Sequence, residues 1–183
     1  MSVGIDAVDQ LDGIAIVRLH ARPDLAELAG LAACWRSLQA DPVVRAVGVL
    51  SVGENFGAAV VADAADPETI APKSSGLLKP FGVGLRGDVF DYALQLVGDA
   101  DTVIATRDAR IGESSVPRGL PSVHAAWLRG SLPEAEINRL ALLGPSSAIT
   151  ATRAAELGLV DEIVDLGALE SVLVRRLLRL TGG

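Results

Sequence analysis

Side chains that commonly carry catalysis are sparse in this sequence. His20 and His124 are its only histidines, and Cys34 is its only cysteine. Two histidines and one cysteine define no Ser-His-Asp arrangement and no metal-ligand spacing, so we expect neither a catalytic triad nor a metal site. A lone cysteine forms no intramolecular disulfide, which is typical of a protein from a reducing, intracellular compartment.

Two acidic residues, Asp88 and Asp91, stand where a helix is expected to begin. A carboxylate at the N-cap and another in the first turn stabilise a helix without any ligand, by about 0.5 to 2 kcal/mol for the cap. We therefore interpret Asp88 and Asp91 as capping residues rather than catalysts.

Apolar runs typical of strands alternate with stretches of helical spacing. The expected strands are 13–20, 46–51, 81–85 and 102–105. The expected helices are an amphipathic stretch over 25–38, a helix over about 89–98, one from the N-cap Thr150 to a stop at Gly158, and one over 169–180. This alternation indicates the α/β class.

Composition bounds the organisation and the partners. The chain has 183 residues, half of them apolar, and a formal net charge of -7, so we expect one domain spanning 1–183. Acidic residues are spread along the chain, which argues against nucleic-acid and anionic-membrane partners. No basic segment followed by an apolar run opens the sequence, and no segment is apolar enough to span a bilayer, so we expect a cytoplasmic protein.

Four segments carry a resemblance to a known family. They are 41–50 (DPVVRAVGVL), 53–59 (GENFGAA), 79–112 (KPFGVGLRGDVFDYALQLVGDADTVIATRDARIG) and 149–160 (ITATRAAELGLV). In the third segment the landmarks are Lys79-Pro80, Gly87, Asp101, Ala109 and Gly112. In their order and spacing these segments resemble the crotonase (enoyl-CoA hydratase/isomerase) superfamily, and the resemblance covers most of the chain.

The resemblance implies a fold and an assembly. The expected fold is an α/β, crotonase-like spiral of ββα units over about 1–165, truncated at the C-terminal helical region. A short terminal helix within about 166–183 follows in place of most of the C-terminal helices of the family. Crotonases usually assemble as trimers or pairs of trimers. We therefore expect a homotrimer or hexamer, or a hetero-oligomer in which a partner covers the exposed apolar surface.

The resemblance also implies a site. In this family two backbone N–H groups hold the thioester oxygen as it becomes an enolate. Ala58 and Tyr92 occupy those oxyanion-hole positions, and Phe56, Ala59 and Asp91 are expected to line the pocket. Tyr92 replaces a family glycine, so its ring either fills the volume of the substrate or stacks on a ligand. Asp91 places a carboxylate where negative charge would develop, which opposes the enolate.

The two glutamates of family hydratases fall at Gln95 and Ser115. An amide has no proton equilibrium near neutral pH, and a serine needs an adjacent base, so neither side chain replaces a general acid or base. Glu113 and His124 are the nearby titratable substitutes. His124 is equally well interpreted as a solvated loop histidine.

Three hypotheses follow for the function. The first is an acyl-CoA or acyl-carrier thioester binder, or an accessory subunit in acyl or polyketide metabolism, without hydratase chemistry. The second is an active, diverged lyase or isomerase that uses Glu113, Ser115 or His124 for proton transfer. The third is a structural subunit whose pocket has closed. No cofactor is expected in any of them, because coenzyme A enters only as part of the thioester ligand.

Overall fold

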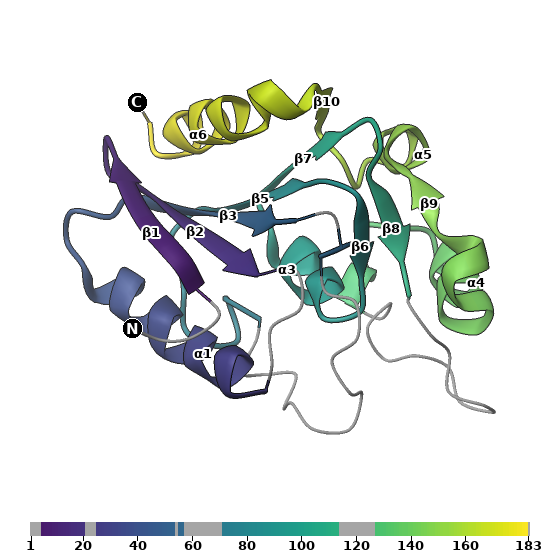
Figure 1. Ribbon diagram of the computed structural model, residues 1–183, viewed down its shortest axis with the longest axis horizontal. Coiled ribbons are helices and arrows are strands. Elements are labelled where there is room, and N and C mark those ends of the chain that lie inside the picture. The colour runs from purple at the N-terminus through teal and green to yellow at the C-terminus, as the bar shows by residue number, and fades with distance from the viewer. Residues whose placement is uncertain (1–4, 21–24, 54, 57–70, 114–126, 183) are drawn as a thin grey trace.

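The computed structural model describes residues 5–20, 25–53, 55–56, 71–113 and 127–182, and within these ranges the strands form two sheets (Figure 1). The larger sheet has the order β1 (Ile5–Leu11), β2 (Ile14–His20), β3 (Ala46–Val52), β5 (Phe81–Leu85), β7 (Thr102–Thr106) and β10 (Glu162–Val164). The smaller sheet has the order β4 (Asn55–Phe56), β6 (Asp88–Phe90), β8 (Arg110–Gly112) and β9 (Ile149–Thr150).

The chain alternates between the two sheets. Strand β3 of the larger sheet is followed by β4 of the smaller one, β5 by β6, and β7 by β8. Pairing is parallel between β3 and β5, between β5 and β7, and likewise between β4, β6 and β8. Successive turns of the chain therefore stack beside one another as a spiral, with helix α3 (Ala93–Asp99) between β6 and β7. The predicted α/β class is confirmed.

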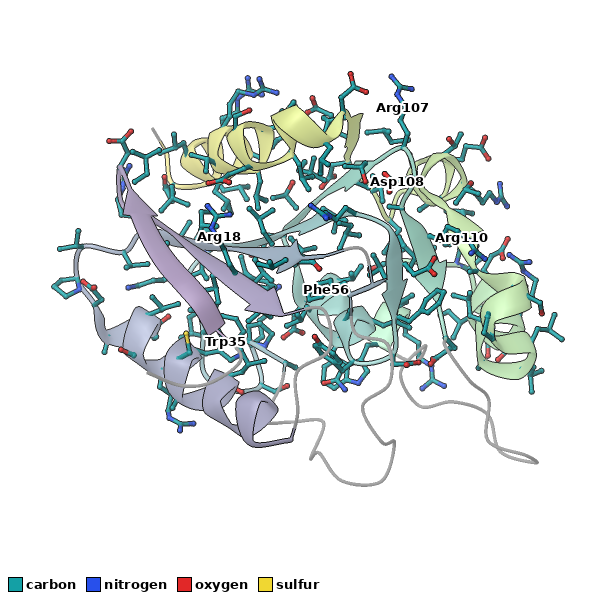
Figure 2. The ribbon with its side chains drawn as sticks, viewed as in Figure 1. Arg18, Trp35, Phe56, Arg107, Asp108 and Arg110 are labelled. Carbon is teal, nitrogen blue, oxygen red and sulfur yellow. The ribbon has the colours of Figure 1, made fainter. Side chains whose placement is uncertain are left out.

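Helices cover both faces of the larger sheet (Figure 1). Helix α1 (Leu25–Ala40) contributes Trp35, which is fully buried and meets the ring of Phe81 edge to face, with the ring centroids 6.0 Å apart. Figure 2 shows Trp35 between α1 and the sheet. This side belongs to the main hydrophobic core, which also includes residues of α3 and of the smaller sheet. Burial of this apolar surface supplies most of the stabilising free energy.

The terminal helix α6 (Leu169–Leu180) covers the opposite face. A second apolar cluster forms there, in which Leu173 and Leu177 of α6 pack on the sheet. The sheet presents glycines beneath this helix, and a Cβ added at Gly48 would lie 3.0 to 3.1 Å from the Leu177 and Leu173 methyl groups. The glycine therefore lets α6 approach the sheet closely.

Several predicted elements are confirmed. Strand β5 spans 81–85 and α6 spans 169–180, as the pattern predicted. Thr150 caps helix α5 (Ala151–Glu156) by accepting a hydrogen bond from the Arg153 N–H at 3.2 Å, and Gly158 follows with a left-handed φ of 81°. Helix α4 (Glu134–Leu143) precedes this unit. In the described ranges no helix is both long and apolar enough to cross a membrane.

The predicted helix over 89–98 begins too early, and the capping interpretation of Asp88 and Asp91 is wrong. Asp88 lies in strand β6, paired with Asn55 on one side and Arg110 on the other. Helix α3 starts at Ala93, with Tyr92 as its N-cap and no acidic residue in its first turn. Backbone pairing with two neighbouring strands keeps residues 88–90 extended, so an acidic pattern typical of a cap lies outside the helix.

Candidate functional site

The carboxyl ends of three parallel strands lie side by side and place several of the described candidate residues near one another. Phe56 ends β4 and pairs with Val89 of β6, while Phe90 of β6 pairs with Gly112 of β8. The chain segments that leave β4, β6 and β8 therefore start from neighbouring positions at one edge of the smaller sheet. Figure 2 shows Phe56 at this edge, near α3. Ligand sites in parallel α/β sheets commonly lie outside the carboxyl ends of the strands.

The turn from β6 into α3 carries two of these residues, Asp91 and Tyr92. Asp91 has a left-handed φ of 53°, a conformation that aspartate tolerates better than most residues with a Cβ. Its N–H donates to the Gly112 carbonyl oxygen at 3.4 Å, and its own carbonyl oxygen accepts from the Leu94 N–H at 2.9 Å. The turn is thus joined to the end of β8 and to the first turn of α3.

The ring of Tyr92 is packed inside the protein. Only 1% of the residue is exposed, and its ring meets that of Phe56 edge to face, with centroids 6.0 Å apart and an interplanar angle of 79°. Edge-to-face pairs are a favourable geometry for aromatic rings. In this structure Tyr92 is therefore part of the main hydrophobic core.

Gln95 and Glu113 flank the turn. Gln95 lies in α3, where its N–H donates to the Tyr92 carbonyl oxygen at 3.0 Å, and its residue is 1% exposed. Glu113 follows Gly112 directly and is fully buried. The edge therefore combines a buried amide, which can orient a polar group without exchanging a proton at neutral pH, with a buried carboxyl group, which can exchange one.

Four predicted site residues lie outside the described part of the chain: Ala58, Ala59, Ser115 and His124. Among the predicted residues that are described, the structure brings the following to one edge of the smaller sheet: Phe56, Asp91, Tyr92, Gln95 and Glu113. Within the described residues no group of three or more His, Cys, Asp or Glu side chains is arranged to hold a metal ion.

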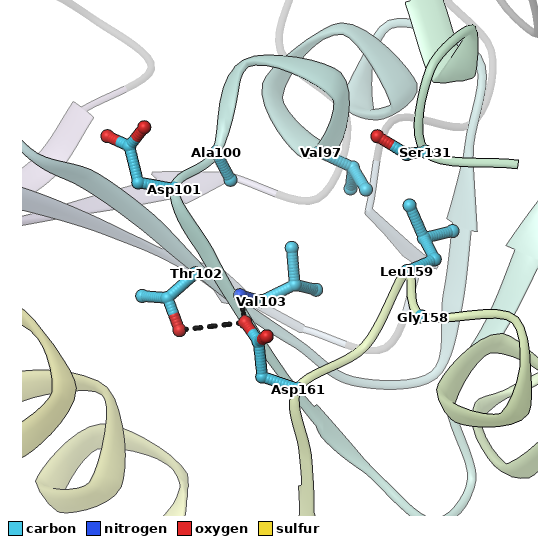
Figure 3. Close-up of a pocket in the computed structure, with 9 residues that line it drawn as sticks. All are labelled: Val97, Ala100, Asp101, Thr102, Val103, Ser131, Gly158, Leu159 and Asp161. Carbon is cyan, nitrogen blue, oxygen red and sulfur yellow. Dashed lines mark hydrogen bonds between the residues drawn. The ribbon is translucent and has the colours of Figure 1, made fainter.

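A separate pocket of about 120 Å³ lies at the start of β7 (Figure 3). Asp161 borders it and accepts hydrogen bonds from the Val103 N–H at 2.7 Å and the Thr102 hydroxyl at 2.9 Å. Ligand pockets usually enclose about 300 to 1,000 Å³, so this one is too small for an acyl thioester. Sequence reasoning did not name Asp161, although it follows the Gly158-Leu159-Val160 motif directly.

Comparison with known proteins places the fold. No protein-family profile and no curated protein matches the chain. Solved structures do: an enoyl-CoA hydratase/isomerase from Mycobacterium paratuberculosis has 22% identity and a TM-score of 0.79, covering 100% of this chain and 75% of that chain. An enoyl-CoA hydratase from Mycobacterium tuberculosis H37Rv has 21% identity and a TM-score of 0.81, covering 97% and 82%.

A third similar structure is an enoyl-CoA hydratase/isomerase from Xanthobacter autotrophicus Py2, with 25% identity and a TM-score of 0.79 over 100% of this chain and 74% of that chain. The chain therefore has the fold of the crotonase superfamily, and the resemblance seen in its sequence is confirmed at the level of the fold. Because one fold hosts many functions, the activity has to be argued from the site.

Proposed function

We propose that this protein binds an acyl-CoA or acyl-carrier thioester and performs no hydratase chemistry, acting as a binder or accessory subunit in acyl or polyketide metabolism. The observation that carries the proposal is the buried amide of Gln95. It lies one helical turn from Tyr92, at the edge of the smaller sheet where β4, β6 and β8 end. An amide in the position of a family glutamate removes the general base that hydration requires.

Binding asks less of the site than hydration does. Backbone N–H groups serve as hydrogen-bond donors whatever side chains they carry, so the positions of Ala58 and Tyr92 are compatible with holding a thioester oxygen. A carboxylate at Asp91 would oppose a negative enolate beside Tyr92, but it would oppose a neutral thioester much less. The site is therefore better suited to the ground-state ligand than to the charged intermediate.

Two measurements on the purified protein test this proposal. Titration calorimetry with crotonyl-CoA and a longer acyl-CoA measures binding, and loss of the absorbance of the conjugated thioester measures hydration. We expect saturable binding with no hydration above the buffer rate. Rapid hydration that Glu113→Gln or His124→Ala abolishes would contradict the proposal and support the active, diverged enzyme instead.

One observation favours a second candidate, a structural subunit with a closed pocket. Phe56, Tyr92 and Glu113 are each at most 1% exposed, so these side chains offer a ligand almost no surface. Absence of binding to every acyl-CoA tested would support this candidate against the first. We also propose that the protein is cytoplasmic and forms a trimer, a hexamer or a complex with a partner chain. Light scattering measures the molar mass of the purified protein and so tests the trimer and the hexamer.

A further inference from the structure

We propose that the ring of Tyr92 is a plug that controls access to the thioester site: the site is closed while the ring packs on Phe56, and a ligand enters when the ring is displaced. This inference rests on the proposed function, because it assigns the means by which that same site opens.

The first step of the inference is that the Tyr92 ring lies where two strand ends of the site meet. Tyr92 is the N-cap of α3, at the junction between the carboxyl end of β6 and the helix that holds Gln95. Its ring contacts Phe56, the last residue of β4. The ring pair therefore joins two of the three strand ends that define the site.

The second step is that the pairing of the strands does not depend on the ring. The strands on which the ring pair rests are paired through their backbones, Phe56 with Val89 and Val89 with Ile111. None of these pairings depends on the side chain of Tyr92. The plug therefore requires only that the ring leave its place beside Phe56 with β4, β6 and β8 still in register.

A variant tests the plug by removing the ring. Tyr92→Ala deletes the phenol and leaves a cavity beside Phe56, a kind of space that small aromatic molecules can occupy. We expect Tyr92→Ala to bind crotonyl-CoA at least tenfold more tightly than the unmodified protein. We also expect phenol, which has the shape of the deleted group, to raise the melting temperature of Tyr92→Ala but not that of the unmodified protein.

The second aromatic pair supplies a matched control. Phe81 meets Trp35 edge to face with the same 6.0 Å separation and an interplanar angle of 70°, on the α1 side of the larger sheet. Phe81→Ala removes an equally buried ring from another place, so it should lose stability without gaining affinity for crotonyl-CoA. Equal gains in both variants would overturn the plug, since they would reflect general loosening of the core.

The outcomes separate this inference from the proposed function. Binding by the unmodified protein decides the proposed function, while the ratio of the two affinities decides the plug. If Tyr92→Ala binds no more tightly than the unmodified protein, the plug is wrong even though the proposed function stands. If only Tyr92→Ala binds, the plug is supported and the natural role as a binder is contradicted. Should Tyr92→Ala fail to fold, Tyr92→Leu offers the same comparison with less lost volume.

Discussion

Gly98, near the end of α3, lies directly against the backbone of Trp127. A Cβ added at Gly98 would meet the carbonyl oxygen of Trp127 and would lie 2.9 Å from its carbonyl carbon. Backbone atoms cannot move away by a change of rotamer as a side chain can. This contact therefore limits how closely α3 can approach the backbone at Trp127. The helix that holds Gln95 is positioned partly by the lack of a side chain at Gly98.

We expect Gly98→Ala to destabilise the protein, although alanine favours a helix by about 1 kcal/mol over glycine. Overpacking of this kind typically costs about 1 to 3 kcal/mol, which exceeds the gain in helix propensity. Urea unfolding measures the change. Gly167→Ala is the control, because an added Cβ there meets nothing within 4 Å. Equal stability of the two variants would contradict the close contact between Gly98 and Trp127.

Asp161→Ala should destabilise the protein by about 1 to 3 kcal/mol, because it leaves the buried Val103 N–H without its acceptor. In the native protein the Asp161 carboxylate accepts from Val103 and Thr102 at once. Asp161→Asn keeps one oxygen in place and should cost less. Denaturant unfolding of the two variants and of Thr102→Val separates the contributions of the two hydrogen bonds to the free energy of unfolding. A near-neutral Asp161→Ala would show that these hydrogen bonds do not hold the start of β7.

Gln95→Glu should not create hydratase activity, and it should lower the stability of the protein at pH 7. The residue is 1% exposed, and burial raises the pKa of an introduced carboxyl group because the charged form is poorly solvated. Below its unfolded-state pKa of about 4.3 such a carboxyl group is neutral in both states and costs no stability. As pH rises from there through the raised folded-state pKa, the group ionises more readily in the unfolded state, which lowers the stability of the folded protein. The stability deficit should therefore shrink as pH falls.

Gln39→Glu is the matched control for that experiment. Gln39 lies on α1, is only partly buried, and accepts hydrogen bonds from the Leu78 and Lys79 N–H groups at 2.9 and 3.3 Å. A carboxylate keeps this acceptor role, so its melting temperature at pH 7 should change little. Loss of crotonyl-CoA absorbance measures hydration in both variants. Hydration by Gln95→Glu but not by Gln39→Glu would contradict the prediction, because it would show that one restored glutamate is enough for hydratase activity.

Cys34 should react slowly with thiol reagents at pH 8. Burial raises the pKa of the Cys34 thiol to about 11, about two pH units above its ordinary value, so the reactive thiolate is about a hundredfold scarcer in the folded protein. Reaction with Ellman's reagent should accelerate about tenfold for each pH unit between 8 and 10. The same reaction in concentrated guanidinium chloride gives the unfolded control. Equal rates in both states would contradict the shift.

Local sequence patterns predicted those elements whose own residues determine them. Strand β5 and helix α6 match their predicted bounds, because an apolar run or a stripe at helical spacing needs only a core to pack on. The cap at Thr150 was likewise confirmed, since its hydrogen bond spans three residues. The short strands of the smaller sheet were missed, because two or three residues carry too little pattern to be recognised.

The candidate site shows the same division. The sequence by itself determined that Gln95 is an amide, that Tyr92 is bulky and that catalytic histidines and cysteines are sparse, and the family resemblance predicted where these residues belong. Only the tertiary structure decided that the ring of Tyr92 meets Phe56 and that Asp88 lies in a strand. Both outcomes depend on pairing between segments far apart in the chain, and the register of such pairing is a property of the whole sheet rather than of any local stretch.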